Sequence, residues 1–322
     1  MRVVFFGSPD FAVPALQALH ADPVFEVVLV VTQAARGVSP VELAATSLGL
    51  PIYKPETLRN PTSREPLIAT MADLFVVAAF GLIFRPSTLA IPRLGSINVH
   101  PSLLPRYRGA SPILAAIHEG DQETGVSLMV MDVGIDTGAV VSTSKVTVAS
   151  DDTTASLGER LARMGAEQAV RDIPRWIDGE LVARSQKNSG ASLTRPLMKS
   201  DGWIDWQRSA IEIERHIRAM WPWPRAWTTV DEALIQVHEA QVVADEPAGT
   251  PHGTVIAHQK RLLIATGRGV LELLTVEPAG RRTMPARAYL NGRRAPMLQL
   301  GTSGAPPSQP PLVVDVSAPA NE

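Results

Sequence analysis

Residues 1–11, MRVVFFGSPDF, place a short apolar run directly before a turn. The apolar run is Val3 to Phe6, and it stops at Gly7-Ser8-Pro9. From Phe11 to about His20, apolar residues recur at the three- and four-residue spacing of a helix. Because glycine and proline interrupt regular structure, this order predicts a buried strand, a tight turn and a helix.

The same alternation continues along the first half of the chain. Apolar runs that predict strands occur at 27–32, 74–79 and 96–100, and helical spacing occurs at 41–48. Strands that are apolar on both faces, separated by helices, are typical of a mainly parallel sheet covered on both sides. The predicted fold class is therefore α/β, and ligands of such sheets bind beyond the carboxyl ends of the strands.

The second half has a different pattern. Helical spacing over 155–176, interrupted by Pro174, is followed by a polar stretch without periodicity. A helix is expected from Ile204, and short apolar runs separated by turn residues continue to about Val276, which predicts a small β-barrel or sandwich. The expected organisation is an α/β domain at 1–180, a linker at 181–203, a β-barrel domain at 204–300 and a mobile tail at 301–322, rich in Pro, Ser and Ala.

The composition bounds the class of protein. At 322 residues, with 45% hydrophobic and 19% charged side chains, the chain can form about two globular domains. The absence of cysteine excludes a disulfide framework, a thiolate metal site and a thiol nucleophile. No run approaches the ~20 apolar residues of a membrane-spanning helix, and residues 1–11 lack the features of a signal peptide. We therefore expect a cytoplasmic protein without a membrane partner.

Charge is distributed unevenly between the two halves. The net charge is −2, yet residues 1–180 carry 14 basic and 19 acidic side chains, whereas residues 181–300 carry 16 basic and 11 acidic ones. An acidic half joined to a basic half is expected if one part does chemistry and the other helps to hold a polyanion. Chance scatter of a few charges is the alternative, and on this signal alone it is the preferred explanation.

The chemically versatile side chains concentrate in residues 95–109, GSINVHPSLLPRYRG. Side chains alternate along a strand, so Asn98 and His100 point to one face. Pro101 ends the strand because it lacks a backbone donor. An amide donor beside an imidazole suits stabilisation of an oxyanion in acyl transfer, with the imidazole also able to handle a proton. Taken singly, the histidine is better explained as a structural residue at a strand end, and the asparagine as a turn cap.

A second polar cluster lies in residues 131–138, MDVGIDTG, between strand-like runs at 126–130 and 139–146. Its glycines permit a sharp turn that brings a carboxylate close to another group. An aspartate near an imidazole orients the ring and favours its charged form. A hairpin loop with solvated carboxylates explains the sequence equally well, and spacing alone does not choose between the two.

Together, these motifs resemble the formyltetrahydrofolate-dependent formyltransferases. The resemblance rests on Asn98–Gly109, NVHPSLLPRYRG, and on Gly134–Gly138, GIDTG. Residues 6–11, FGSPDF, and 79–83, AFGLI, are similar to the same family, and the similarity extends over about 1–294. No G-x-G-x-x-G follows the first strand, which weakens a dinucleotide-binding alternative.

The resemblance implies a Rossmann-like catalytic domain, a linker and an open, OB-like β-barrel that contacts tRNA. It implies transfer of the formyl group of 10-formyltetrahydrofolate to the α-amine of initiator methionyl-tRNA, without a metal, by a protein that we expect to be monomeric. The positions that match the family's catalytic residues are Asn98, His100 and Asp136. Those that match its folate-binding stretch are Ser102, Leu103, Leu104 and Pro105, with Phe80, Gly81 and Leu82 beside the pteridine pocket. Candidates for holding acidic substrate groups are Arg106 and Arg108, which flank the folate stretch.

Basic residues in the second half are candidates for phosphate contacts, with a solvated basic surface as the alternative. They are Arg281, Arg282, Arg293 and Arg294, called the C-terminal arginines below. Family members that act on tRNA carry a long basic loop after the second strand, whereas this chain has only AARGV at 34–38, with Arg36 as its basic residue. Either the loop is short or residues are absent from the sequence at this point, and we expect the latter.

Three other functions are compatible with the same motifs. A formyltransferase that acts on a nucleotide-linked amino sugar and a formyltetrahydrofolate hydrolase share the catalytic set. A folate- or RNA-binding protein without activity is the third, and the intact set of Asn98, His100 and Asp136 argues against it. Formyl transfer to aminoacyl-tRNA, measured against a nucleotide-sugar acceptor, discriminates among them.

Overall fold

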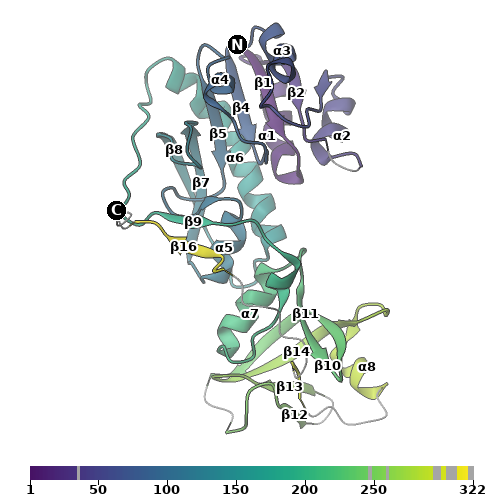
Figure 1. The fold of residues 1–322 in the computed structure, drawn as a ribbon. Helices are drawn as coiled ribbons and strands as arrows, with labels where there is room; N and C mark the ends of the chain where they lie inside the picture. Colours follow the sequence, from purple (N-terminus) through teal and green to yellow (C-terminus); the bar gives the residue numbers. More distant parts are fainter. Residues whose placement is uncertain (35–36, 246–248, 259–260, 293–298, 302–309, 318–322) are drawn as a thin grey trace.

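The computed structural model describes residues 1–34, 37–245, 249–258, 261–292, 299–301 and 310–317. The protein has two lobes, an α/β lobe that contains the N-terminus and a smaller lobe built on antiparallel strands (Figure 1). The expected fold class, a Rossmann-like domain followed by an open β-barrel domain, is confirmed. None of the described helices combines the length and the apolar character needed to cross a membrane.

A seven-stranded sheet forms the centre of the α/β lobe, in the order β3-β2-β1-β4-β5-β7-β8. The strands are β1 Arg2–Gly7, β2 Glu26–Val31, β3 Ile52–Tyr53, β4 Leu74–Ala78, β5 Ser96–His100, β7 Glu123–Val130 and β8 Val140–Thr147. The pairs from β3 to β5 are parallel, whereas β7 runs antiparallel to both β5 and β8. The apolar runs identified in the sequence are thus the parallel strands, and β7 and β8 extend the sheet beyond β5.

Alternate residues of β1 face opposite layers of helices. Val3 and Phe5 belong to the core on the side of α1 (Val13–Ala21) and α6 (Thr154–Ile177). Val4 and Phe6 belong to a second core, on the side of α3 (Pro61–Ala69) and α4 (Pro86–Leu89). The other short helices are η1 Asp10–Ala12 and α2 Pro40–Ser47, the latter begun by a capping box between Ser39 and Glu42. Burial on both faces explains why this strand is apolar throughout.

The smaller lobe contains a six-stranded antiparallel sheet in the order β10-β11-β14-β13-β12, with β15 paired to β14. Its elements are β10 Ala226–Val230, β11 Ala233–Ala244, β12 Val255–His258, β13 Arg261–Ala265, β14 Val270–Pro278, β15 Met284–Pro285 and α8 Ala286–Asn291. Register shifts between β11 and β14 interrupt the regular ladder, and such irregularities bend a strand. The sheet curls into an open half-barrel, and α7 (Ala210–Ala219) packs between it and α5 (Pro112–His118) of the α/β lobe.

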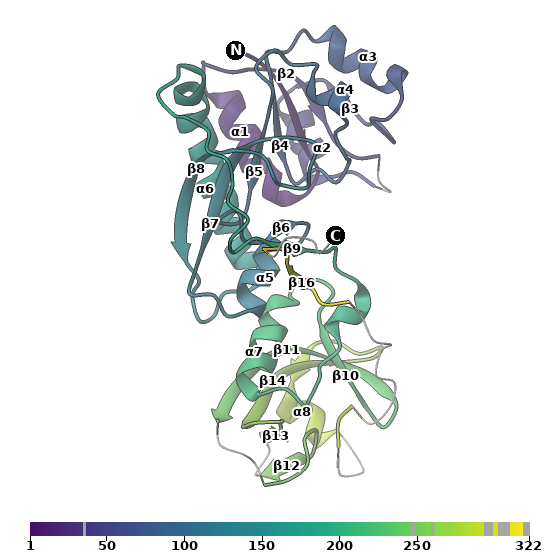
Figure 2. The ribbon, with the colours of Figure 1, turned by 60° about the vertical axis from the view of Figure 1, so that its left-hand side comes forward.

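A third sheet joins segments that are distant in sequence. Its order is β16-β9-β6, formed by Val313–Asp315, Ser192–Thr194 and Arg108–Gly109. Figures 1 and 2 both place β16 beside β9, between the two lobes. The expectation of a mobile tail is therefore wrong for residues 313–315, because their backbone pairs with β9. The expected linker likewise contains a strand, and the proposed boundaries at 180, 203 and 300 stay predictions.

Two expected helices differ in detail. α6 passes through Pro174 and ends at Ile177, because a proline in the last turn removes only one backbone bond of the helix. The helix expected from Ile204 begins at Ala210, where Ser209 and Glu212 form a capping box. Before it, the chain forms the short 3₁₀ helix η2, Lys199–Gly202, and Ile204 is buried in the core.

Candidate active site

Asn98 and His100 lie at the carboxyl end of β5, on the same face of the strand. Ile97 and Val99 point to the opposite face and are buried in the core with the helices. Asn98 is 9% exposed and His100 is 3% exposed. Both polar side chains are thus withdrawn from bulk water. Hydrogen bonds and charge interactions are stronger in such a buried environment than in water.

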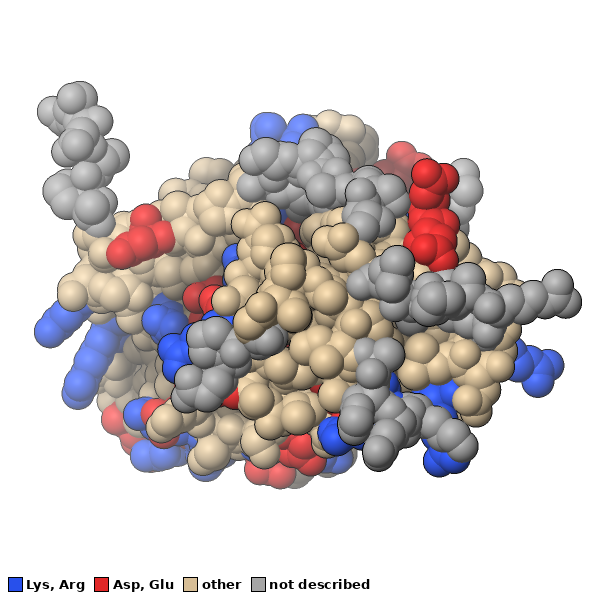
Figure 3. Space-filling view, turned by 90° about the horizontal axis from the view of Figure 1, so that it is seen from below, with Lys and Arg blue, Asp and Glu red and all other residues tan. Residues whose placement is uncertain are grey.

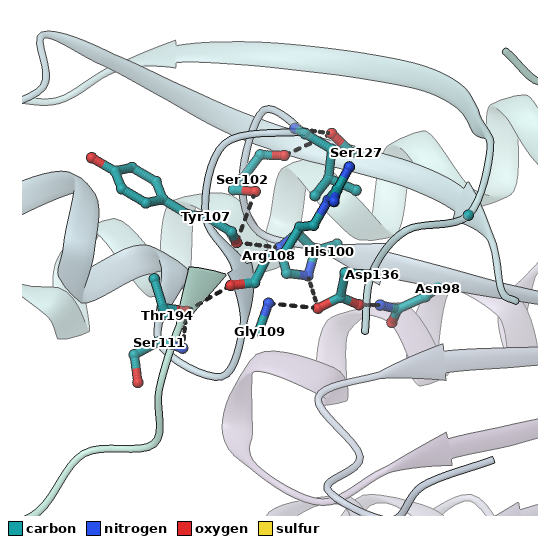
Figure 4. Close-up of polar contacts among 12 residues, drawn as sticks. Asn98, His100, Ser102, Tyr107, Arg108, Gly109, Ser111, Ser127, Asp136 and Thr194 are labelled. Carbon is teal, nitrogen blue, oxygen red and sulfur yellow. Dashed lines mark hydrogen bonds and ion pairs between the residues drawn. The ribbon is translucent and has the colours of Figure 1, made fainter. Parts of the chain in front are cut away.

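Asp136, in the loop between β7 and β8, contacts both β5 side chains (Figure 4). Its Oδ1 accepts a hydrogen bond from Asn98 Nδ2 at 3.3 Å, and its Oδ2 lies 3.6 Å from His100 Nδ1. The backbone N–H of Gly109 donates to Oδ2 at 2.8 Å. The side chains singled out in the sequence therefore form one contacting cluster, and their catalytic roles are developed as a proposal below.

The orientation of the His100 ring is fixed by a backbone group. Nε2 lies 2.8 Å from the carbonyl oxygen of Tyr107, which can only accept, so Nε2 carries a hydrogen and donates. In the neutral ring the lone pair is then on Nδ1, which faces Asp136. Protonation at Nδ1 turns this contact into an ion pair, so the ring can hold a proton between its own nitrogen and the carboxylate.

The folate stretch predicted at 102–105 curls over the end of β5. Ser102 is fully buried, and its hydroxyl donates to the Arg106 carbonyl at 2.7 Å, so this side chain shapes the loop. The Leu104 N–H donates to the hydroxyl of Ser127 on β7 at 3.1 Å. Leu104 and Pro105 line an open groove of about 570 Å³ that β8 and residues 180–189 complete.

The predicted pteridine-pocket residues follow β4. Phe80 is buried and packs edge-on against Phe6 of β1, with ring centroids 5.3 Å apart, so it anchors this loop to the core. Gly81 is exposed, and Leu82 packs beside the same aromatic core. None of these residues lines the groove beside Leu104. The two predicted folate segments thus flank the Asn98–His100–Asp136 cluster without sharing that groove.

Comparison with known proteins bears on both lobes. Residues 1–173 match the family model described as formyl transferase, and residues 196–294 match the model described as formyl transferase, C-terminal domain. The chain belongs to the formyl transferase family.

Curated relatives of this formyl transferase are similar over nearly their whole length. The methionyl-tRNA formyltransferase of Roseiflexus sp. (strain RS-1) is 43% identical over 302 residues, covering 91% of this chain and 93% of the relative. That of Methylococcus capsulatus is 42% identical over 310 residues, covering 94% of this chain and all of the relative.

Solved structures share the fold at much lower identity. The N-formyltransferase of Helicobacter canadensis, in complex with folinic acid and dTDP-3-aminofucose, is 18% identical, with a TM-score of 0.63 over 84% of this chain and 98% of that one. The sugar 3N-formyl transferase WlaRD is 17% identical, with a TM-score of 0.65 over 88% and 99% of the two chains. At these identities, the likeness supports the fold alone.

Several groups at the site of this formyl transferase were not assigned a role in the sequence analysis. The Gly109 N–H and the Tyr107 carbonyl are backbone groups, so the residue type does not predict their contacts. Gln186 donates to carbonyl oxygens of the Asp136 loop, although it lies in a stretch that lacked periodicity. Ile83, Val133 and Ile135 expose large apolar side chains, at 70%, 72% and 61% of their surface.

The arginines that flank the folate stretch have partners within the protein. Arg106 forms an ion pair with Asp121 and lies 4.5 Å above the Tyr107 ring. Burial, followed by the bond to Asp121, raises the pKa of the Tyr107 hydroxyl. Arg108 is buried and donates to the side-chain oxygen of Gln186. Both guanidinium groups therefore contact the protein itself, and their expected contact with acidic substrate groups stays a prediction.

The arginines predicted to contact tRNA are only partly described. Arg281 and Arg282 are exposed between β14 and β15. Arg36, Arg293 and Arg294 lie outside the described residues, as does part of the short segment after β2, so the structure does not test the expectation of an incomplete loop. Seen from the end formed by the smaller lobe, described basic and acidic side chains both gather near the rim, around a largely uncharged centre (Figure 3). The excess of positive charge in the second half thus forms no continuous basic surface on the described part of this end.

Proposed function

We propose that this protein transfers the formyl group of 10-formyltetrahydrofolate to the α-amine of initiator methionyl-tRNA. The observation that carries the proposal is the identity of 42–43%, over more than nine tenths of this chain, with relatives named methionyl-tRNA formyltransferases. The contacting cluster of Asn98, His100 and Asp136 supplies groups suited to this reaction. Among the described residues no group of three or more His, Asp or Glu side chains is arranged to hold a metal.

The reaction requires a donor for the developing oxyanion and a carrier for protons. The acceptor amine adds to the formyl carbon of the folate donor to give a tetrahedral oxyanion, and the bond from that carbon to N10 then breaks. Asn98 has one amide hydrogen left after its bond to Asp136, and this hydrogen can donate to the formyl oxygen. Both ring nitrogens of His100 face other groups, the Tyr107 carbonyl and the Asp136 carboxylate, so a protonated ring would stabilise the negative charge through its own positive charge. Asp136, through a water molecule, accepts the proton that the amine loses and returns one to N10.

The apolar surroundings of the cluster fit an aromatic donor. Ile83 lies in the loop after β4, and Val133 and Ile135 lie in the loop that carries Asp136, where all three expose large apolar side chains. Apolar side chains around a few convergent polar groups are typical of small-molecule sites. The pteridine ring buries these surfaces in our proposal.

Transfer to a nucleotide-linked amino sugar is the principal alternative, because the sugar transferases have the same fold. The preference for tRNA rests on identity: 42–43% with the tRNA enzymes against 17–18% with the sugar enzymes. Hydrolysis of the donor, with water as acceptor, is the second alternative. The initiator preference, a monomeric state and a cytoplasmic location stay predictions.

A competition assay tests the acceptor. Purified protein is incubated with 10-formyltetrahydrofolate and with initiator methionyl-tRNA, an elongator methionyl-tRNA, a nucleotide-linked amino sugar or no acceptor. Formylated product and released formate are both measured, and the Asp136→Asn variant shows that the signal comes from this site. We expect the highest kcat/KM with the initiator tRNA. A higher kcat/KM with the amino sugar, or formate release unaffected by any acceptor, would refute the proposal.

A further inference from the structure

Asp136 has a backbone conformation that its surroundings must maintain. Its φ angle is 52°, in the left-handed region, which aspartate tolerates better than most residues but which still disfavours a side chain. The contacts to Asn98 and Gly109 require the carboxylate to point in one direction. Asp136 therefore needs groups that hold its own peptide units in place.

Gln186 supplies such groups from the segment between α6 and β9. Its Nε2 donates to the carbonyl oxygen of Asp136 at 2.7 Å and to that of Gly138 at 2.8 Å. Both hydrogens of the amide are thus used on the loop that carries the carboxylate. The two bonds lie on either side of Thr137, so they fix the direction in which the loop leaves Asp136.

The other end of the Gln186 amide is fixed as well. Its Oε1 accepts from Arg108 Nε at 3.0 Å and from Arg108 Nη2 at 2.9 Å. Arg108 is buried, and its neighbour Gly109 donates the backbone bond to the Asp136 carboxylate. Arg184 and Val140 exchange both of their backbone bonds, which anchors this segment against the start of β8. The amide therefore connects the loop of Asp136 to the strand that binds its carboxylate.

We propose that Gln186 is a positioning residue that sets the Asp136 carboxylate against Asn98 and His100. The proposal rests on the function proposed above for its consequence in turnover, but its geometric claim is independent of the acceptor. Gln186 touches no reacting atom in this scheme and acts through Asp136. Glutamine is suited to the position because one amide provides two donors for the carbonyls and an acceptor for the guanidinium.

Two substitutions separate these contributions. Gln186→Met keeps a similar length and volume but removes all the polar contacts. Gln186→Glu keeps an acceptor for Arg108 but places a carboxylate beside two carbonyl oxygens, so the loop contacts are lost and replaced by repulsion. Asn188→Ala is the matched control, because Asn188 lies in the same segment, its side chain is exposed and it is not among the residues that line the groove beside Leu104.

The first measurement is turnover with saturating donor and acceptor. A displacement of about 1 Å at a reacting group can lower a rate ~10²-fold, so we expect kcat to fall by about 10- to 100-fold in both Gln186 variants, with a much smaller change in KM for the donor. In an Asp136→Asn background, Gln186→Met should cause little further loss, because the group on which it acts is already altered. An equal, independent loss in that background, or wild-type turnover in Gln186→Met, overturns the proposal.

A second measurement needs no substrate. The Gly109 amide is held by the Asp136 carboxylate, so a loosened Asp136 lets this amide exchange its hydrogen several-fold faster. We expect faster exchange in Gln186→Met and wild-type exchange in Asn188→Ala. Unchanged exchange in Gln186→Met overturns the positioning role, whatever the acceptor is. Faster exchange in a protein that does not formylate tRNA preserves the positioning role and refutes only the proposed function.

Discussion

Replacing Asp136 with asparagine removes the charge at the centre of the cluster while preserving its shape. Asparagine adopts the left-handed conformation as readily as aspartate, so the φ of 52° adds no strain. One side-chain oxygen remains to accept the fixed Gly109 N–H. The new NH₂ group then faces Asn98 Nδ2, and a flip of the Asn98 amide restores an acceptor. The fold should therefore tolerate the change.

The expected effects on stability and turnover differ in size. A hydrogen bond to a charged group contributes about 1.5–3 kcal/mol and a neutral one about 1 kcal/mol, so the variant should lose about 1 kcal/mol of unfolding free energy. That corresponds to a fall in Tm of only about 2–4 °C. Loss of the proton acceptor, together with loss of the counter-ion of His100, should lower kcat by ~10²–10⁴-fold. The ratio of these effects distinguishes a chemical role from a structural one.

Single-turnover formyl transfer and thermal unfolding of the same preparations provide the assay. Asp136→Ala is the comparison, because it adds left-handed strain of about 1–2 kcal/mol to the loss of the carboxylate. It should be less stable than the asparagine variant while being similarly inactive. Turnover of Asp136→Asn within tenfold of wild type, at an unchanged Tm, would refute the assignment of a proton-transfer role to this carboxylate.

Further predictions concern other parts of the molecule. Burial, and then the charge of His118, lowers the pKa of His216 from 6.5 to about 3. Between about pH 3 and 6.5, the His216 imidazole is therefore protonated in the unfolded chain and neutral in the folded chain. The free energy of unfolding should decrease on acidification through this window by up to about 1.4 kcal/mol per pH unit. The decrease in unfolding free energy per pH unit should be smaller in His216→Gln. Urea unfolding at several pH values measures this free energy, and an equal pH dependence in the wild type and the variant would exclude this role for His216. Replacing the C-terminal arginines with alanine should weaken tRNA binding and flatten its dependence on salt, whereas an unchanged slope leaves them as surface charges. Deleting residues 310–322 removes β16 and the packing of Val313 against the Tyr107 cluster, so Tm should fall by several degrees; an unchanged Tm would mean that this strand adds no stability.

The parallel strands could be predicted from the sequence because each is buried on both faces. A strand such as β4, LFVVA, has no polar alternation to confuse with a surface element, and turn residues mark its limits. The common direction of Asn98 and His100 followed from the two-residue period of a strand. The approach of Asp136 did not follow from spacing, because it depends on how the hairpin of β7 and β8 returns to β5.

Strands β9 and β16 could not be predicted because each is stabilised by residues far away in the sequence. β9, SLT, is three residues long, and its pairing partners lie near positions 108 and 314. The hydroxyl of Ser192 accepts from the Tyr107 N–H, and the hydroxyl of Thr194 donates to the Arg108 carbonyl. Such bonds leave no periodicity in the sequence, because they require a polar side chain at single positions.

The short strand β6 explains why segments outside the α/β sheet matter to the chemistry. Its backbone binds the Asp136 carboxylate through Gly109, while the preceding Tyr107 carbonyl orients the His100 ring. Two residues cannot form a stable strand alone, and β6 is held by β9, which β16 covers on its other edge. The relative placement of His100 and Asp136 is therefore set by backbone groups whose support comes from residues 192–194 and 313–315. Changes in these segments should alter turnover through geometry, without touching any side chain that contacts the substrates.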